Sequence, residues 1–426
     1  MLMLAIFIAL VAMICINVPI AIGLALAGVL GLLATEGADS LVTIALDMYD
    51  GSTKFSLIAI PMFVLAGAIM NAGGITDRLI NFVSAIIGFV RGGLAMVNIG
   101  VSLFFAEISG SAVADVAAMG SILIPQMKKC GYSKELSAAV TSSSASLAII
   151  IPPSIPMILY AASANTSVEQ LFVAGVVPGL MGAFGLMLVA YIFARRYNLP
   201  TEEAFNIPRL RETFMDALPA FTLPVIILGG IFGGFVTATE AAGLAVIAAI
   251  VVSVWYRQID IAHLRRAMLD GGMQTAVVML LVAASVLMGG FLTRAQIPQQ
   301  LAQGILNITD QQWLIFLILN FFFLVIGFFL HSAAAIILVV PIVIPLITAA
   351  GIDPVHFGLV VTLNLAIGQQ TPPVASVLIT SCAVARANIW EVSKVNVWFV
   401  MVLLAVLLLC TYVPSVPLFL VEYFYR

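Results

Sequence analysis

A Pro-Pro pair interrupts a long apolar run at two places in this chain. Pro152 and Pro153 lie within LAIIIPPSIPM, and Pro372 and Pro373 lie 220 residues later within IGQQTPPVASV. Each proline lacks a backbone N–H and clashes with the carbonyl one turn earlier, so a pair unwinds a helix. The same offset relates Ile124-Pro125 to Ile344-Pro345 and Gly131 to Gly351. The chain is therefore predicted to contain an internal repeat with one broken helix in each copy.

Composition places these breaks in a membrane. Hydrophobic residues make up 63% of the 426 residues, charged residues make up 9%, and the mean hydropathy is +1.19. Apolar runs long enough to cross a bilayer recur from end to end, which predicts an all-α polytopic membrane protein. We expect residues 1–426 to form a single integral membrane domain. Unwound backbone at membrane depth persists only inside protein or along a wet cavity, so the paired breaks indicate a transport site.

The beginning of the chain and the cysteines support simple expectations. The segment that starts at Leu2 has no basic n-region and no cleavage site, so it is expected to be retained. It runs to Ala34 and is interrupted by Asn17-Val18-Pro19, which fits one tilted span or two short ones. Four scattered cysteines without CxxC spacing are expected to be free thiols: Cys15, Cys130, Cys382 and Cys410.

The remaining apolar runs predict an order of helices. Spans are expected at Phe55–Met70, Val168–Ala194, Phe214–Phe232, Thr237–Tyr256, Met268–Leu292 and Trp398–Phe419. Ile155–Ala164 is expected to complete the first broken helix, and Val355–Pro372 to lead into the second break. Asp77–Arg91 and Thr293–Ile308 are expected to be amphipathic helices that lie along the interface or link moving parts.

Two further segments are apolar runs with a polar centre. Leu94–Met127 is interrupted between Glu107 and Asp115, and Trp313–Ala349 is interrupted near His331. Each half of the first segment is roughly 15 residues, short of the roughly 20 that a span needs, so we expect re-entrant helical hairpins. Residues 94–165 are predicted to form the first transport-core repeat and residues 313–385 the second. The remaining spans are expected to form a scaffold with interfacial arm helices.

Charge predicts the orientation of the two repeats. Three loops concentrate the basic residues and are expected in the cytoplasm: Lys128–Lys134, Arg195–Arg211 and Arg257–Arg266. The second copy of the Lys-rich turn, Gly351–Pro354, has no Lys or Arg and is expected outside. Five expected crossings separate the two turns, so the repeats are predicted to be inverted across the membrane. Inverted repeats with broken helices at the midplane are typical of secondary transporters.

Several long sequence runs resemble one known family. They are SGSAVADVAAMGSILIPQM (Ser109–Met127), KCGYSKELSAAV (Lys129–Val140), IIIPPSIPMILY (Ile149–Tyr160), TATEAA (Thr237–Ala242) and GIDPVHFGLV (Gly351–Val360), the last followed by TPPV. These runs are similar to the large membrane subunit of tripartite ATP-independent periplasmic (TRAP) transporters, the DctM-like permeases. The resemblance extends over essentially the whole chain. Three positions depart from the expected pattern: Ala148 and Ala375 replace Gly, and His331 replaces an acidic residue.

The resemblance implies a function and a set of partners. It implies sodium-driven symport of an organic acid, either a C4-dicarboxylate or a sialic-acid-like carboxylate, across the bacterial inner membrane. A periplasmic substrate-binding protein would deliver the acid, and a transport domain would move like an elevator beside a scaffold. A smaller, DctQ-like membrane subunit is also implied. Sodium is then the transported coupling ion, and no organic cofactor is expected.

Candidate site residues lie at the hairpin tips and at the breaks. Sodium prefers hard oxygen donors, which unwound carbonyls and hydroxyls supply. One sodium site is expected between the hairpin tip at Ser109, Gly110 and Ser111 and the break residues Ala148, Ile151 and Ser154. The other is expected between Leu330, His331 and Ser332 and the break residues Gly368, Gln370 and Thr371. A substrate carboxylate is expected between the two sites, where helix N-termini and hydroxyls would bind it. The favoured substrate contacts are Ser111, Ser143, Ser332, Gln370 and Thr371.

The ionisable residues each have two interpretations. Glu107 and Asp115 lie near the first hairpin tip, where a carboxylate inside the membrane indicates a functional role. The alternative for Glu107 is a position at the membrane interface. The alternative for Asp115 is a helix cap. Glu240 fits either N-terminal capping after Thr237 or a role in gating. His263 and His356 are expected in solvated loops.

Competing classes of function leave different signatures. The sequence has no HExxH motif, and it has no paired membrane aspartates or Ser-His arrangement at a useful spacing, so no enzyme is expected. A channel would present a lined pore, and a kinked helix packed on its neighbours is the structural alternative for the breaks. The closest rival is a stand-alone secondary anion transporter of related fold that needs no binding protein. Membrane lipids are expected contacts, and nucleic acid is not.

Overall fold

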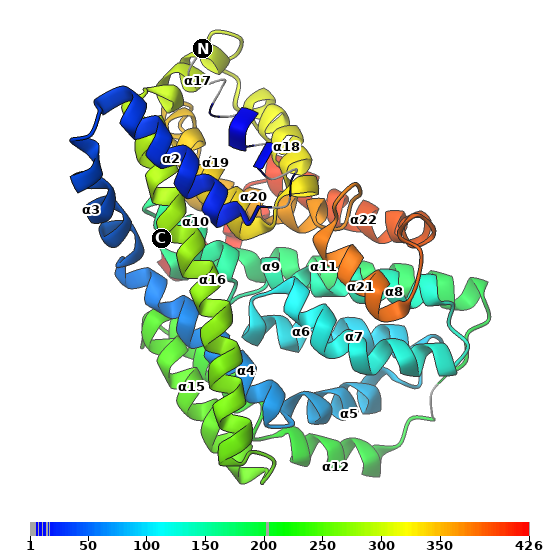
Figure 1. Cartoon of the computed structure of the whole chain (residues 1–426). Helices are drawn as coiled ribbons and strands as arrows, with labels where there is room; N and C mark the ends of the chain where they lie inside the picture. The colour runs from blue at the N-terminus through cyan, green and yellow to red at the C-terminus, as the bar shows by residue number, and fades with distance from the viewer. Residues whose placement is uncertain are drawn as a thin grey trace.

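The computed structural model describes residues 6, 8–10, 12, 13, 16, 18–201 and 204–425. The side chains of residues 41, 43 and 107–109 are outside this description, and so is residue 15. The predictions for Glu107, for the Ser109 side chain and for Cys15 therefore lie outside the described residues. Figure 1 shows the whole molecule as an assembly of helices.

The described helices follow the predicted order. The first part contains α2 (Ile20–Glu36), α3 (Ser40–Ser52), the 3-10 helix η1 (Phe55–Ile58), α4 (Ala59–Ala72), α5 (Ile75–Ile87), α6 (Gly93–Ser109), α7 (Ala112–Lys129), α8 (Lys134–Ala145), α9 (Leu147–Ile150), α10 (Ile155–Ala164) and α11 (Val168–Arg196). The central part contains α12 (Ile207–Ala217), α13 (Thr222–Pro224), the π-helix η2 (Val225–Gly229), α14 (Gly230–Phe232), α15 (Ala238–Trp255) and α16 (Ile261–Arg294). The last part contains α17 (Ile297–Leu306), α18 (Gln312–Phe329), α19 (Ser332–Ala349), α20 (Pro354–Gly368), α21 (Ser376–Ala385), α22 (Ile389–Tyr412) and α23 (Ser415–Tyr425).

Hydropathy accounts for the membrane character of these helices. Within the described part of the chain, eight helices are long and apolar enough to cross a membrane. The expected hairpins correspond to α6 with α7 and to α18 with α19. The arms have 17 and 18 residues in the first hairpin, longer than the roughly 15 expected there, and 18 each in the second. By length and composition α18 and α19 each qualify as spans, so the re-entrant placement stays a prediction.

Two predicted spans differ in the structure. The helix expected over Phe214–Phe232 is divided into two parts. The first part belongs to α12, which ends just before Pro219. The second part starts with α13 and is bent by 53° relative to α12. The last span was expected from Trp398 but starts at Ile389, where the Asn388 side chain caps α22 by accepting a hydrogen bond from Trp390 N (2.9 Å). Pro414 follows the end of α22, so the rest of the predicted range lies in the separate helix α23.

The local chemistry of the two repeats is similar. The turns before α8 and α20 contain Gly131 (φ 87°) and Gly351 (φ 66°), and this left-handed backbone favours glycine. Each broken helix then starts at a side-chain cap. Ser133 Oγ accepts from Leu136 N (3.1 Å), and Asp353 Oδ1 accepts from Val355 N (2.8 Å). The repeat read from the sequence therefore extends to the turns and caps of these helices.

The two repeats pack into each other. The second half of each broken helix contacts the hairpin of the other repeat, because α10 packs on α19 and α21 packs on α7. The long helices α11 and α22 pack on α20 and α8, respectively. The helices α2, α3, α4, α15 and α16 gather on one side of this core in Figure 1, and the arm α5 lies with α12 below it. The largest buried cluster contains side chains around both breaks. Inversion of the repeats across a membrane stays a prediction.

Candidate functional site

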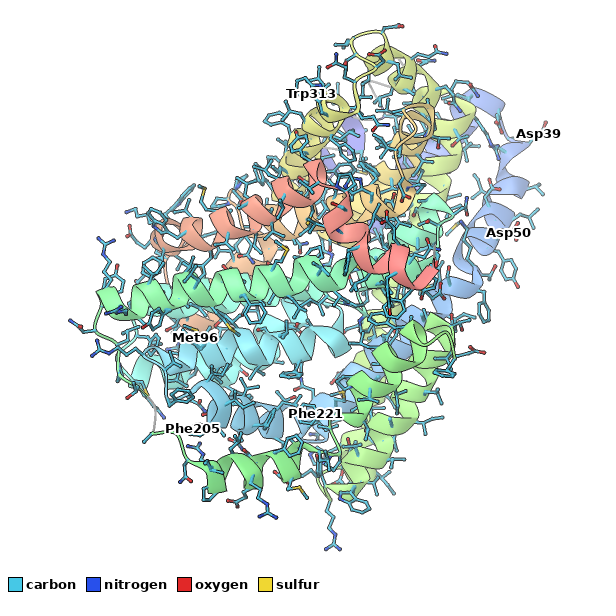
Figure 2. All side chains as sticks on the ribbon, turned by 180° about the vertical axis from the view of Figure 1, so that it is seen from behind. Asp39, Asp50, Met96, Phe205, Phe221 and Trp313 are labelled. Atoms are coloured by element: carbon cyan, nitrogen blue, oxygen red, sulfur yellow. The ribbon has the colours of Figure 1, made fainter. Side chains whose placement is uncertain are left out.

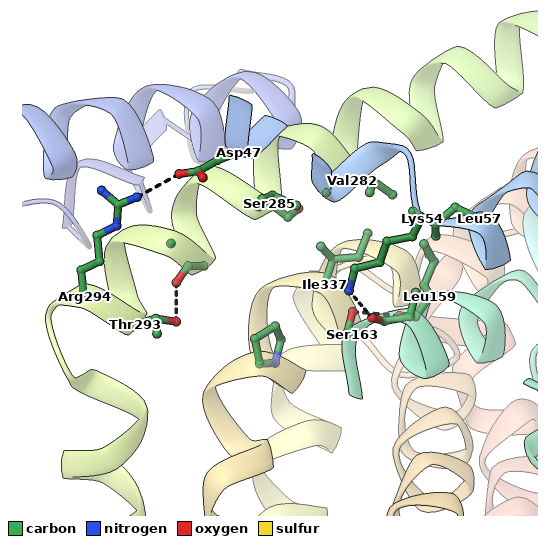
Figure 3. A pocket seen from close by; sticks show the side chains of 16 residues that line it. Asp47, Lys54, Leu57, Leu159, Ser163, Val282, Ser285, Thr293, Arg294 and Ile337 are labelled. Atoms are coloured by element: carbon green, nitrogen blue, oxygen red, sulfur yellow. Dashed lines mark hydrogen bonds and ion pairs between the residues drawn. The ribbon is translucent and has the colours of Figure 1, made fainter. Parts of the chain in front are cut away.

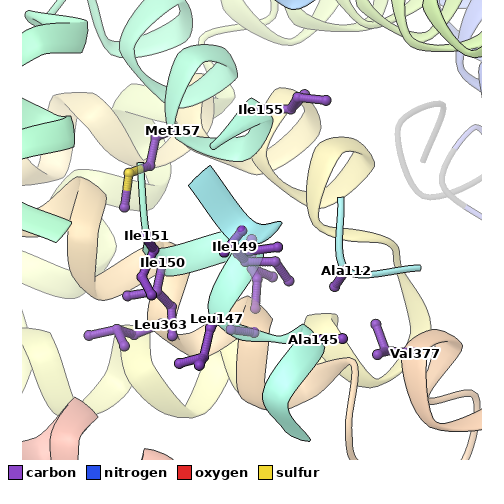
Figure 4. Packing of buried hydrophobic residues seen from close by; sticks show 14 of the residues in the cluster. Ala112, Ala145, Leu147, Ile149, Ile150, Ile151, Ile155, Met157, Leu363 and Val377 are labelled. Atoms are coloured by element: carbon purple, nitrogen blue, oxygen red, sulfur yellow. The ribbon is translucent and has the colours of Figure 1, made fainter. Parts of the chain in front are cut away.

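The first break is a buried, extended segment between α9 and α10. The backbone is extended at Ile151 and again at Ser154 (ψ 132° and 124°). Ser154 Oγ donates to Ile149 O (2.8 Å) and accepts from Met157 N (3.5 Å), so one hydroxyl joins the two helical segments. Figure 4 shows the apolar side chains that surround this segment, including Ile149 and Ile151. Ala148 and Ser154 are each 0% exposed, which places these predicted residues inside the protein.

The first hairpin tip touches this break. Gly110 has φ 58°, and the extended residue Ser111 then precedes α7. A Cβ atom on Gly110 would lie 3.1 Å from Ile155 N and 3.2 Å from Pro153 O. The tip and the break are therefore in backbone contact. The contact is made by Pro153 and Ile155, which flank the predicted residue Ser154.

The second break follows the last turn of α20. The side chain of Thr371 donates to Ile367 O (3.1 Å), and Ser376 Oγ donates to Gln369 Oε1 (3.2 Å). Ala375 has φ 47°, a left-handed conformation in which the expected glycine would be less strained. Thr371 is only partly buried, whereas Ser154 at the first break is fully buried. The two breaks therefore differ in access to their surroundings.

The second hairpin meets its break at two glycines. A Cβ atom on Gly368 would lie 2.5 Å from Gly327 Cα, so the main chains of α18 and α20 are in direct contact there. Leu330 and His331 form the extended tip, and the buried residue Ser332 begins α19. The structure thus brings the predicted residue Gly368 against the second hairpin. The contact lies at Gly327, three residues before Leu330.

A buried cluster of polar residues joins the two repeats. We call this cluster the polar clamp; it consists of Ser142, Ser143, Ser146, Gln370 and Asn396. Gln370 Oε1 accepts from Ser142 Oγ (2.6 Å), and Gln370 Nε2 donates to Ser142 O (2.5 Å) and to Ser146 Oγ. Ser143 Oγ donates to Asn396 Oδ1 (2.7 Å), and Asn396 Nδ2 donates to Gln370 O (3.2 Å). All five residues are at most 1% exposed. Ser143 and Gln370, both predicted to contact substrate, are therefore bonded to other protein groups.

Asparagines tie each hairpin to its broken helix. In the first repeat, Ser144 Oγ donates to Asn98 Oδ1 (3.1 Å). In the second, Asn364 Nδ2 donates to Asn320 Oδ1 (2.7 Å), and Asn320 Nδ2 donates to Thr411 Oγ1 (3.2 Å). Sequence reasoning did not select Asn98, Asn320 or Asn396. The signal that was available is an asparagine within an apolar helix, which needs a partner in a membrane protein.

A cavity of about 400 Å³ lies between α3, α10, α16 and α19. Figure 3 shows Lys54 and Arg294 on its wall. Lys54 Nζ donates to Ala162 O (2.7 Å) near the end of α10, and Arg294 pairs with Asp47 (3.0 Å) and Glu36 (2.5 Å). The described lining includes none of the predicted substrate residues. This cavity separates helices of the core from helices outside it.

Ionisable residues outside the two breaks have defined environments. Asp115 is 1% exposed in the first turn of α7, and it lines a cavity of about 60 Å³ with Asn71 and Gln274. Glu240 forms a capping box with Thr237, because Glu240 Oε2 accepts from Thr237 N (2.8 Å) and Glu240 N donates to Thr237 Oγ1 (3.3 Å). The capping interpretation of Glu240 is therefore confirmed.

The prediction that His356 lies in a solvated loop is wrong. Asp353 caps α20, so His356 falls in its first turn and is 3% exposed. Its Nε2 lies 2.7 Å from Cys410 O, and its ring packs against Phe316. His263 is exposed as expected, although in the first turn of α16. The hydrogen bond from His263 N lowers the pKa of Asp260, the cap of α16.

Comparison with known proteins identifies the family. The model described as "Tripartite ATP-independent periplasmic transporter, DctM component" matches residues 7–416. The chain belongs to the DctM family. It is a TRAP transporter large permease, a polytopic membrane protein and not an enzyme. The resemblance stated from the sequence runs is confirmed.

Three relatives show the breadth of this DctM family. The C4-dicarboxylate TRAP large permease DctM of Pseudomonas aeruginosa is 38% identical over 89% of this chain and 89% of that protein. The isethionate TRAP permease DctMQ of Oleidesulfovibrio alaskensis is 37% identical over 95% of this chain and 64% of that protein. The sialic acid TRAP large permease SiaM of Vibrio cholerae is 35% identical over 89% of each.

A solved structure shares the fold. The YdaH transporter of Alcanivorax borkumensis matches with a TM-score of 0.66 over 89% of this chain and 89% of that chain, at 14% sequence identity. At this identity the likeness concerns the fold alone. It agrees with the predicted class of an all-α membrane transporter.

Proposed function

We propose that this large permease takes up a small organic acid by sodium symport across the bacterial inner membrane. The relatives are named for C4-dicarboxylate, isethionate and sialic acid, which are all organic anions. The observation that carries the proposal is the paired contact of hairpin and break. Gly110 meets the first break at Pro153 and Ile155, and Gly327 meets the second at Gly368. Two similar sites of this kind suit coupling of ions to a substrate between them.

The sodium ligands would come from the tips and the unwound turns. At the first site we assign Ser109 and Gly110 with Ala148, Ile151 and Ser154. At the second we assign Leu330, His331, Gly368 and Thr371. The side chain of Thr371 donates its proton to Ile367 O, so its oxygen lone pairs are oriented away from that carbonyl. A hydroxyl in this state is a suitable ligand for a hard cation.

The substrate carboxylate would bind between these sites. Ser111 and Ser332 stand at the N-termini of α7 and α19, where the helix dipole favours an anion. Thr371 lies beside the second break and is partly exposed. Ser143 and Gln370 belong to the polar clamp, so we assign them to positioning of the breaks and not to direct contact.

Alternating access would follow from movement of the core as a unit. We assign residues 94–165 and 313–385 to this core, and α2, α3, α4, α15 and α16 to the scaffold. The interpacking of α10 with α19 and of α21 with α7 favours joint movement of both repeats. The cavity at Lys54 and Arg294 lies where the proposed core and scaffold face each other. An elevator movement of inverted repeats would use such a boundary.

Two protein partners complete the proposal. A DctQ-like small membrane subunit would bind the scaffold, and a periplasmic binding protein would deliver the acid. The relative named DctMQ supports the first partner, because its name joins both components and this chain covers 64% of it. The description of the family as tripartite and periplasmic supports the second.

Reconstituted uptake tests this function. The permease and its small subunit are placed in liposomes with the cognate binding protein, loaded with radiolabelled acid. Uptake is expected only with an inward sodium gradient. Equal uptake in potassium with a proton gradient would contradict sodium coupling. Uptake without the binding protein would favour the stand-alone anion transporter instead.

A further inference from the structure

An apolar cavity of about 410 Å³ lies between α17, α18, α19 and the last turns of α16, and Figure 1 shows α17, α18 and α19 at the same end of the molecule. Among the residues that the structure describes, all that line it are apolar: Leu10, Met288, Leu292, Ile297, Leu301, Ile305, Ile318, Leu319, Phe322, Ile326, Leu330, Leu338, Val339, Ile342 and Val343. Water needs two or more polar partners to occupy a cavity stably, and this lining offers none from its side chains. An apolar occupant is therefore favoured.

The cavity has the depth of one leaflet of a bilayer. Its wall runs from Ile318 on α18 to Leu330, the extended residue just past the end of that helix, and spans about 18 Å at the helical rise of about 1.5 Å per residue. One leaflet contributes about 15 Å of hydrocarbon. Trp313 stands about one and a half turns before Ile318 and is 55% exposed, and Figure 2 shows it at the outer edge of the molecule. A tryptophan at this position marks the level of the headgroups.

The open side of the cavity faces the surroundings of the protein. Leu301 on α17 and Phe322 on α18 belong to the lining and are 36% and 42% exposed. Phe321, the neighbour of Phe322, is 71% exposed. Apolar side chains that are exposed on a membrane helix face acyl chains wherever no other helix covers them. The mouth between α17 and α18 therefore opens towards acyl chains.

The first repeat provides an internal comparison. There the arm α5 packs directly on the hairpin helix α6, and side chains such as Val83, Val97 and Val101 form one buried cluster. In the second repeat the corresponding arm α17 packs on α19 instead. The cavity lies between α17 and α18, where the first repeat has packed side chains. Among the described residues, the second repeat therefore lacks side chains that fill this space, whereas the first repeat has them.

We propose that this cavity binds one acyl chain of a phospholipid. The chain enters between α17 and α18 and runs along α18, and its methyl end lies against Leu330. The helix α17, with sequence IPQQLAQGIL, has no Lys or Arg, so no cation on it selects an anionic headgroup. Recognition rests on the acyl chain. Because Leu330 adjoins His331 and Ser332 at the hairpin tip, the bound chain supports the tip, and its departure leaves the tip without packing on that side.

Photo-crosslinking at two depths tests the proposal. The permease, with its small subunit, is placed in nanodiscs that contain phosphatidylcholine with a diazirine either at the end of one acyl chain or close to the glycerol. After irradiation, the labelled peptides are identified by mass spectrometry. The terminal probe is expected to label Ile326, Leu330 and Leu338. The glycerol-proximal probe is expected to label Leu301 and Ile318. Labelling without this order of depth would overturn the proposal.

Two substitutions on the same helix separate a bound chain from surrounding lipid. Leu319 lines the cavity and is 3% exposed, whereas Leu317 is 47% exposed and does not line it. Leu319→Trp is expected to reduce labelling of the lining on the order of tenfold, because the indole occupies the space. Leu317→Trp is expected to leave it unchanged. If Leu319→Trp does not fold, Ile305→Phe fills the same cavity from α17. If a variant with a filled cavity folds and is still labelled, the proposal is contradicted. The proposal is also contradicted if the wild-type protein is labelled without the small subunit but not with it, because a protein helix then occupies the cavity.

Discussion

Gln370 shows how one residue connects both repeats. Its side chain bonds to Ser142 and Ser146 of the first broken helix, and its carbonyl accepts from Asn396 on α22. No single helix supplies this set of partners. In an apolar interior, a polar atom without a hydrogen-bond partner lowers the stability of the fold. Each of these groups therefore needs the others as hydrogen-bond partners. The polar clamp therefore fixes the second break relative to the first.

Replacement of Gln370 is expected to weaken the whole fold. Gln370→Leu removes the acceptor of the Ser142 hydroxyl and the amide that donates to Ser142 O and Ser146 Oγ, at about 1–3 kcal/mol for each group left without a partner. We expect a clear fall in the midpoint of thermal unfolding, measured by intrinsic fluorescence in detergent. Gln369→Leu is the matched control, because in the described part of the chain the Gln369 side chain bonds within the second repeat, to Leu365 O and Ser376 Oγ. Equal midpoints for the two variants would show that the clamp does not join the repeats energetically.

Thr371 tests whether the second break binds an ion. Thr371→Val keeps the shape of the side chain and removes the oxygen that we assign to sodium. The loss of one ligand is expected to cost about 1–3 kcal/mol, or a rise of about 5- to 150-fold in the sodium concentration for half-maximal uptake. Ser376→Ala is the control, because Ser376 Oγ is bonded to Gln369 Oε1. Unchanged sodium dependence in a folded Thr371→Val protein would make this break a structural kink only.

At the scale of elements, main-chain contact between two helices replaces side-chain packing where the second hairpin meets the second break. The helices α18 and α20 approach through Gly327 and Gly368, so their main chains touch. Small residues allow this approach in membrane proteins, where van der Waals contact is a main force between helices. A methyl group at the crossing would separate the hairpin from the break that it contacts.

Gly368→Ala is therefore expected to destabilise the protein. The new Cβ would lie 2.5 Å from Gly327 Cα, which is main chain and cannot rotate away. Overpacking of this kind costs about 1–3 kcal/mol. Gly272→Ala on α16 is the control, because nothing lies within 4 Å of its Cβ position. Thermal unfolding in detergent should separate the two variants, and similar midpoints would mean that α18 and α20 can move apart without loss.

At the scale of the molecule, the sequence was most informative where local chemistry decides the structure. The Pro-Pro pairs and the turn glycines Gly131 and Gly351 act through their own backbone, so the breaks and turns were predictable. Asn98 and Asn396 were not, because their roles depend on partners on other helices: Asn98 bonds to Thr141, 43 residues away, and Asn396 bonds to Ser143, 253 residues away. The buried position of His356 was missed for the same reason. Its burial comes from α18 and α22, which a local pattern does not show.

Orientation is the remaining property of the molecule that charge alone predicted, and a native cysteine allows a test. Cys130 is an exposed free thiol in the Lys-rich turn of the first repeat, and Cys382 and Cys410 are buried. If the basic turns are cytoplasmic, a membrane-impermeant maleimide should label Cys130 in inside-out vesicles and not in intact cells. Cys15 is replaced by Ser beforehand, so that it gives no background.

The second repeat is tested at the matching turn. Ala349 is exposed at the end of α19. It lies just before the turn that contains Gly351, and this turn has no Lys or Arg. In a protein that carries Cys15→Ser, Cys130→Ser and Ala349→Cys, the same maleimide should label intact spheroplasts and fail with inside-out vesicles. Labelling of both positions from one side would mean that the repeats are parallel. The two breaks would then be related by an axis along the membrane normal, and the elevator movement of inverted repeats would no longer follow.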